Sequence, residues 1–116
     1  MRRLIKSFGY AFSGAAYAFG TQLNFKIHCL ALMIVLALGW YLDISVQEWL
    51  TIVIVSGIVI VAELFNTALE VLVDLVSPDY HEKAKIIKDV SAAAVLIAAA
   101  TAMVVGLVIF IPKICC

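Results

Sequence analysis

One segment of the sequence carries acidic and amide side chains at a spacing that suits a single face of a helix. Glu63, Asn66, Glu70 and Asp74 are separated by three, four and four positions, with mostly apolar residues between them. At about 100° and 1.5 Å per residue, the four side chains fall within an arc of about 80° and rise about 16 Å. Three carboxylates on one stripe repel each other and are costly to desolvate. The stripe therefore needs a cation, a basic partner or shared protons.

The residues alone leave four explanations of this acidic stripe open. The acids could be solvated at an interface, could cycle protons or cations in a coupled transporter, or could form hydrogen bonds between helices. They could also hold Mg²⁺ for phosphate chemistry, with one carboxylate acting as a base. Nearby charges of both signs favour this fourth explanation, because phosphoryl transfer depends on positioning and charge neutralisation. These charged and polar neighbours are Asp79, Tyr80, His81, Lys88 and Asp89.

The composition indicates where such a helix lies. The chain has 116 residues, of which 66% are apolar and 14% charged, and its mean hydropathy is +1.14. A soluble domain is about half apolar and about a quarter charged, so an autonomous soluble fold is excluded, as are a disordered chain and a disulfide scaffold. The formal net charge is zero, which gives no sign of a nucleic-acid partner. The chain is predicted to be an integral membrane protein.

The apolar stretches predict an all-α protein with one unit over residues 1–116. Transmembrane helices are expected at roughly 25–43, 47–68 and 89–111. The first residues, roughly 3–20, have an apolar face and a basic face, which predicts an amphipathic helix on the membrane surface. Ser77-Pro78-Asp79 should end the second transmembrane helix, because proline cannot continue a helical ladder.

The basic residues predict the orientation in the membrane. Seven of the eight precede the first span or lie between the second and third, and only Lys113 falls on the other side. Because cytoplasmic loops carry an excess of lysine and arginine, the N-terminus and the second loop should be cytoplasmic and the C-terminus outside. The acidic stripe then lies at the cytoplasmic end of the second span.

These segments resemble a known family. The stretch AELFNTALE at residues 62–70, with Asp74 after it, is followed by SPDYH at 77–81 and AKIIKD at 84–89. This combination resembles the bacterial integral-membrane diacylglycerol kinase and undecaprenol kinase family. The resemblance covers nearly the whole chain, including the surface helix and NFKIH at 24–28. The pairing of E-x-x-N-[ST]-A-x-E with the later Y-H and K-D pairs is highly specific.

The resemblance implies a kinase that transfers the γ-phosphate of MgATP to a membrane lipid alcohol. It implies a homotrimer in the bacterial inner membrane, with active sites formed between neighbouring chains. Glu63 falls on the family's catalytic base, which binds the lipid hydroxyl, Asn66 helps to hold that site, and Glu70 falls on a metal ligand that also belongs to the ATP site. The other positions that match contacts to ATP or its phosphates are Arg3, Tyr10, Asp79, Tyr80, His81, Lys88 and Asp89.

One position departs from the family pattern. Gln22 stands where many members carry a glutamate that joins Glu70 on the metal. A glutamine can coordinate through its carbonyl oxygen but adds no negative charge. The metal site is therefore expected to be weaker, or another acid such as Asp89 substitutes.

Two further hypotheses remain beside the kinase. A small oligomeric proton- or cation-coupled transporter would move Glu63 between the two faces, although alternating access favours sites near the midplane. A passive assembly partner would tolerate loss of both Glu63 and Glu70. The lipid substrate stays open between diacylglycerol and undecaprenol, and the residues from Ser77 to Asp89 look closer to the undecaprenol kinase branch.

Overall fold

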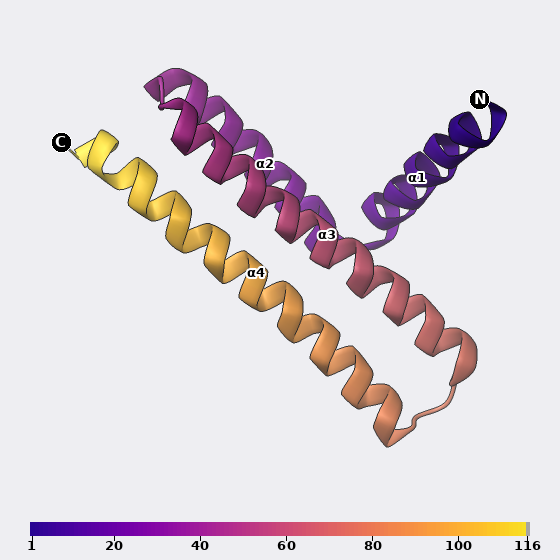
Figure 1. Cartoon of the computed structure of the whole chain (residues 1–116). Helices are drawn as coiled ribbons and strands as arrows, with labels where there is room; N and C mark the ends of the chain where they lie inside the picture. The colour runs from indigo at the N-terminus through magenta and orange to yellow at the C-terminus, as the bar shows by residue number, and fades with distance from the viewer. Residues whose placement is uncertain (116) are drawn as a thin grey trace.

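The computed structural model of the protein describes residues 1–115, and these residues form four helices without a strand. The helices are α1 (Arg2–Thr21), α2 (Leu23–Leu42), α3 (Val46–Val76) and α4 (Glu82–Cys115). Figure 1 shows α3 and α4 as a long antiparallel hairpin with α2 alongside α3, while α1 projects away from these three. The expected all-α architecture, with a separate N-terminal helix, is confirmed.

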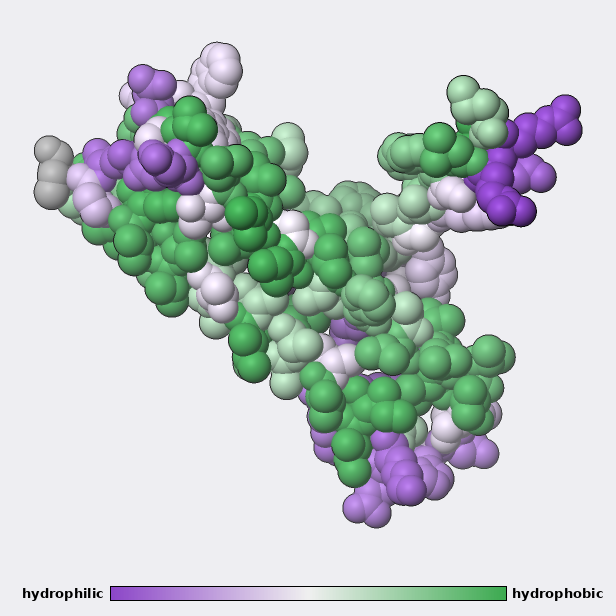
Figure 2. Space-filling view, in the orientation of Figure 1, coloured by the Kyte–Doolittle hydropathy of each residue, from purple (hydrophilic) through white to green (hydrophobic). Residues whose placement is uncertain are grey.

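Three of the helices, α2, α3 and α4, are long and apolar enough to cross a membrane. Figure 2 shows a hydrophobic surface over the middle of the bundle and hydrophilic surface at its ends and at the beginning of α1. At 1.5 Å per residue, α2 is about 30 Å long, which matches the hydrocarbon core of a bilayer. The chain is therefore a membrane protein.

The two long helices exceed that thickness. With 31 and 34 residues, α3 and α4 are about 46 and 51 Å long. The second span was expected over 47–68 and the third over 89–111; the observed helices continue to Val76 and begin at Glu82, because no helix breaker interrupts either segment. Both extensions lie at the end of the hairpin where Ser77-Pro78-Asp79 makes the turn, as expected from the proline.

The opposite end of the bundle is fixed by a tight turn between α2 and α3. Ser45 caps α3: its hydroxyl accepts the Glu48 N–H at 3.2 Å, and Glu48 accepts the Ser45 N–H at 2.9 Å. Lys113 of α4 lies 3.2 Å from the same glutamate. Gly39 permits the close approach of α2 to α3, since a Cβ there would lie 2.8 Å from the Trp49 ring. A small core of Ile44, Ile52 and Phe110 packs at this end.

The first helix is joined to the bundle at its C-terminal end. Gln22 is extended, with φ −112° and ψ 112°, and separates α1 from α2. The Phe19 and Phe25 rings meet edge to face at 6.4 Å, and the Lys26 ammonium lies 5.9 Å from the centre of the Phe19 ring. Ala18 is fully buried, whereas the large apolar side chains of the predicted lipid face of α1 are exposed. This arrangement suits a helix that rests on a bilayer.

Candidate functional site

The acidic stripe lies on α3 and changes steadily in exposure along the helix. Glu63 is only 1% exposed and Asn66 is 7% exposed, Glu70 is half-buried, and Asp74 is exposed. The stripe thus runs from the interior of the bundle to the end that is predicted to be cytoplasmic. Simple solvation at an interface does not describe Glu63, which is the most buried charged side chain among the described residues.

A histidine from the neighbouring helix meets the buried glutamate. The Nε2 atom of His28 on α2 lies 3.1 Å from Oε1 of Glu63, although the two are not aligned as a hydrogen bond. Within residues 1–115, this oxygen has no hydrogen-bond partner. A buried carboxylate oxygen left in this state is available to a polar group of a ligand. His28 was not among the expected site residues, because a pattern on one helix does not reveal its partner on another.

Asn66 is held by a hydrogen bond between α3 and α4. The Ser91 hydroxyl donates to Oδ1 of Asn66 at 2.6 Å, and Nδ2 of Asn66 donates to Oε1 of Glu70 at 3.4 Å. The longer bond is weak, but it directs the amide N–H groups toward the carboxylate. Ser91 was not among the expected site residues, and its position at the start of the small-residue run of α4 was the only sequence signal for it.

A second feature lies beyond the stripe, in the α3–α4 turn. Residues of both helices and the turn surround a hollow of about 290 Å³. Its lining includes five expected ATP-contacting residues: Asp79, Tyr80, His81, Lys88 and Asp89. The structure therefore brings these five residues together around one hollow, and Asp74 and Lys85 line it as well.

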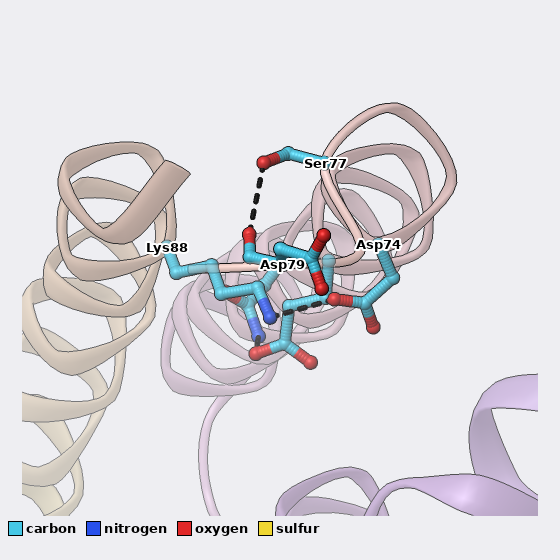
Figure 3. Close-up of polar contacts among 6 residues, drawn as sticks. Asp74, Ser77, Asp79 and Lys88 are labelled. Carbon is cyan, nitrogen blue, oxygen red and sulfur yellow. Dashed lines mark hydrogen bonds and ion pairs between the residues drawn. The ribbon is translucent and has the colours of Figure 1, made fainter. Parts of the chain in front are cut away.

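Ion pairs organise the charges around this hollow. Nζ of Lys88 lies 2.8 Å from Oδ1 of Asp74 and thereby connects α4 to α3, as Figure 3 shows. Lys85 pairs with Asp89 along α4 at 2.7 Å. Lys88 lies on the part of α4 that precedes the uncharged membrane segment, and its hydrogen bond to Asp74 raises the pKa of its ammonium group. Both lysines thus line the hollow, and each is paired with an aspartate.

The turn itself is held by local hydrogen bonds. The Ser77 hydroxyl donates to the carbonyl oxygen of Asp79 at 3.1 Å (Figure 3). Nδ1 of His81 accepts the backbone N–H of Lys83 at 3.1 Å and so caps the beginning of α4. His81 therefore has a structural role in the turn. Tyr80 is 82% exposed, so its ring is free to contact a ligand at the rim of the hollow.

The remaining expected site residues lie elsewhere in the chain. Arg3 and Tyr10 belong to α1, which Figure 1 shows well apart from the α3–α4 turn. Gln22 lies at the α1–α2 junction and is half-buried. Among residues 1–115, no three His, Cys, Asp or Glu side chains are gathered as a metal site. A single chain thus assembles the Glu63 region and the turn hollow without Arg3 and Tyr10.

Known proteins are similar in sequence to this chain over most of its length. The model of the prokaryotic diacylglycerol kinase family matches residues 9–110, a range that leaves out Arg3. An undecaprenol kinase of Bacillus subtilis is 38% identical over 113 residues, which cover 97% of this chain and 92% of that protein. A diacylglycerol kinase of Escherichia coli K12 is 29% identical over 88% of this chain and 84% of its own length.

A diacylglycerol kinase of Synechocystis is 44% identical over 110 residues. The match covers 94% of this chain, which spans 63% of the length of that relative. All three relatives are named as lipid kinases, and none is named as a transporter. With the family model matching nearly the whole membrane region, the chain belongs to the prokaryotic diacylglycerol kinase family of membrane lipid kinases.

Proposed function

We propose that the protein transfers the γ-phosphate of ATP to the hydroxyl of a lipid alcohol, either diacylglycerol or undecaprenol. The products are ADP and phosphatidic acid or undecaprenyl phosphate. The observation that carries this proposal is the Oε1 atom of Glu63, a buried carboxylate oxygen that lacks a hydrogen-bond partner within the described residues. An acceptor of this kind is suited to take the proton of a hydroxyl group.

The position of Glu63 suits a lipid substrate. His28, its contact on α2, lies one and a half turns into that helix, just beyond Lys26. We infer that the pair lies near the end of the apolar stretch, at the depth where the hydroxyl of a membrane lipid meets the aqueous phase. In the reaction, Glu63 accepts the hydroxyl proton while the lipid oxygen bonds to the γ-phosphorus and the bond to the β–γ bridging oxygen breaks.

The turn hollow suits the nucleotide. It lies beyond Asp74, about 16 Å along α3 from Glu63, and two lysines line it. Lysine ammonium groups bind phosphate oxygens as point charges. ATP would thus extend from the hollow toward Glu63, with Lys88 on its phosphates and the ring of Tyr80 at the rim.

The donor set around Glu70 fits Mg²⁺. This ion is usually bound through one or two carboxylates together with substrate phosphates, rather than by a cage of protein ligands. Glu70, half-buried and contacted by Asn66, supplies one such carboxylate, while Gln22 supplies at most a neutral oxygen. When bound with ATP, the ion neutralises phosphate charge. We assign Glu70 as its principal protein ligand, with Gln22 as a secondary one and Asp89 as an alternative acid.

A homotrimer completes the site. Arg3 and Tyr10 lie apart from the turn hollow of their own chain, so we infer that α1 contributes them to a site shared with a neighbouring chain. The excess of basic residues on one side further supports an inner-membrane orientation with the N-terminus and the hollow in the cytoplasm and the C-terminus outside.

The test is a phosphorylation assay in mixed micelles. Radiolabelled ATP is supplied with diacylglycerol and undecaprenol side by side, and phosphate incorporation into each lipid is measured. We expect one of the two lipids to be phosphorylated, and Glu63→Gln to reduce turnover to background while folding and oligomer size stay unchanged. Absence of label in both lipids contradicts the proposed function, and a Glu63→Gln variant with near-normal rates contradicts the assignment of the base.

A further inference from the structure

The contact between α2 and α3 joins a buried group to a more exposed one. Nε2 of His28 lies 3.1 Å from Oε1 of Glu63, and the two side chains are 23% and 1% exposed. Among the described residues, Oε1 has no hydrogen bond, and the imidazole of His28 is its ion-pair contact. Glu63 is therefore almost fully buried in the single chain, while the contacting His28 side chain is partly exposed.

The other titratable groups near this pair are few. On α3, Glu70 is within electrostatic range of Glu63, and on α2 the neighbouring thiol of Cys29 is as well. Lys26 is directed to the Phe19 ring of α1, and α4 contributes the neutral Ser91 through Asn66. Lys88 of α4 is engaged with Asp74 farther toward the turn. None of these groups duplicates the contact of His28 with Oε1.

The surroundings on the membrane side offer no alternative proton acceptor. His28 lines one part of an apolar hollow of about 530 Å³ between α2, α3 and α4, and it is the only titratable side chain among the residues that line it. A proton removed from a lipid hydroxyl must leave Glu63 after each turnover, because a protonated carboxyl cannot act as a base again. An imidazole suits this step, since it gains and loses protons near neutral pH.

We propose that His28 is a positioning residue that holds the Glu63 carboxylate in place and takes over its proton after phosphoryl transfer. The proton moves from the lipid hydroxyl to Oε1 of Glu63 as the new P–O bond forms. It then passes to the unprotonated Nε2 of His28, and the imidazolium loses its Nδ1 proton to water, which restores both groups. The proposal rests on the kinase function proposed above.

The experiment compares His28→Ala and His28→Gln with the full-length wild-type protein in the mixed-micelle assay. Glutamine keeps a polar group but cannot carry the proton, so we expect both variants to lose about 10-fold or more in kcat. The KM for ATP should stay unchanged, because the nucleotide hollow lies at the far end of α3. Added imidazole should restore activity to His28→Ala, and the restoration should increase as the pH rises through about 7, where imidazole becomes unprotonated.

The matched control is Leu32→Ala, which removes a side chain from the same apolar hollow one turn farther along α2. Imidazole should not stimulate this variant. A normal kcat in both His28 variants overturns the proposal. A normal kcat in His28→Gln together with a low kcat in His28→Ala also overturns it, because a side chain that only fills space would then be sufficient. An inactive wild-type protein instead overturns the kinase function, so the two failures are distinguishable. If His28→Ala does not fold, the kcat and pH profile of His28→Gln decide alone.

Discussion

Replacement of Ser91 by alanine removes the hydrogen bond that holds Asn66 between α3 and α4. That bond is 2.6 Å long, and the amide it serves is 7% exposed. Hydrogen bonds between membrane helices contribute about 0.6 kcal/mol on average and up to about 1.7 kcal/mol. Because this one is short, and because its loss leaves a buried acceptor without a partner, we expect a loss of about 1–2 kcal/mol, near the upper end of that range.

A change of this size alters the population of the native Asn66 arrangement by a factor of about 5–30. Ser91→Ala should therefore lower the free energy of unfolding, measured by denaturant titration in micelles, and should also lower kcat, because the amide no longer directs its N–H groups to Glu70. Thr101→Ala on the same helix is the control, since that hydroxyl bonds only the Ile97 carbonyl of its own helix at 2.9 Å. If Ser91→Ala is as stable and as active as Thr101→Ala, the reasoning about Asn66 is refuted.

Four further substitutions test other parts of the structure. Lys88→Met should raise the KM for ATP about 10-fold or more, because it removes the proposed phosphate contact. Asp74 raises the pKa of Lys88, so Asp74→Asn should shift the loss of ATP affinity at high pH to a lower pH. An unchanged steady-state KM in the first variant and an unchanged pH profile in the second would contradict these expectations. Gln22→Glu should lower the Mg²⁺ concentration that gives half-maximal activity by adding a carboxylate near the Glu70 site, and an unchanged Mg²⁺ titration would remove Gln22 from that site. Gly39→Ala should destabilise the α2–α3 turn by about 1–3 kcal/mol, because its Cβ would lie 2.8 Å from the opposite indole ring; thermal unfolding equal to wild type would show that the ring moves aside freely.

The sequence predicted the features that depend on one helix at a time. The proline at 78 ended α3 as expected, and the spacing from Glu63 to Asp74 placed those side chains on one continuous helix. The residues between Ser77 and Asp89 lie around one hollow in the structure, because a short turn brings the ends of α3 and α4 together. Their contacts to ATP stay a prediction.

The contacts between helices were harder to predict. Glu63 contacts His28 of α2, and Asn66 bonds Ser91 of α4. These contacts depend on the rotation and depth of α2 and α4 relative to α3, which the pattern of a single helix does not contain. Ser91 also lies in a run of small residues that looks like a plain packing surface. The sharing of Arg3 and Tyr10 between chains stays a prediction, since it concerns an assembly rather than a single chain.

The unequal lengths of the helices have a consequence for substrate traffic. On the side of the α3–α4 turn, α2 begins at Leu23 and the hairpin of α3 and α4 continues beyond this point (Figure 1). The two proposed substrates, lipid and nucleotide, can therefore each remain in their own phase. In the proposed reaction, the lipid would diffuse laterally to Glu63 without leaving the bilayer, and ATP would bind at the α3–α4 turn without entering it. The two substrates would then meet on the protein at the membrane surface. The rate of phosphorylation should therefore depend on the local bilayer thickness, which sets how far the α3–α4 hairpin extends beyond the lipid headgroups.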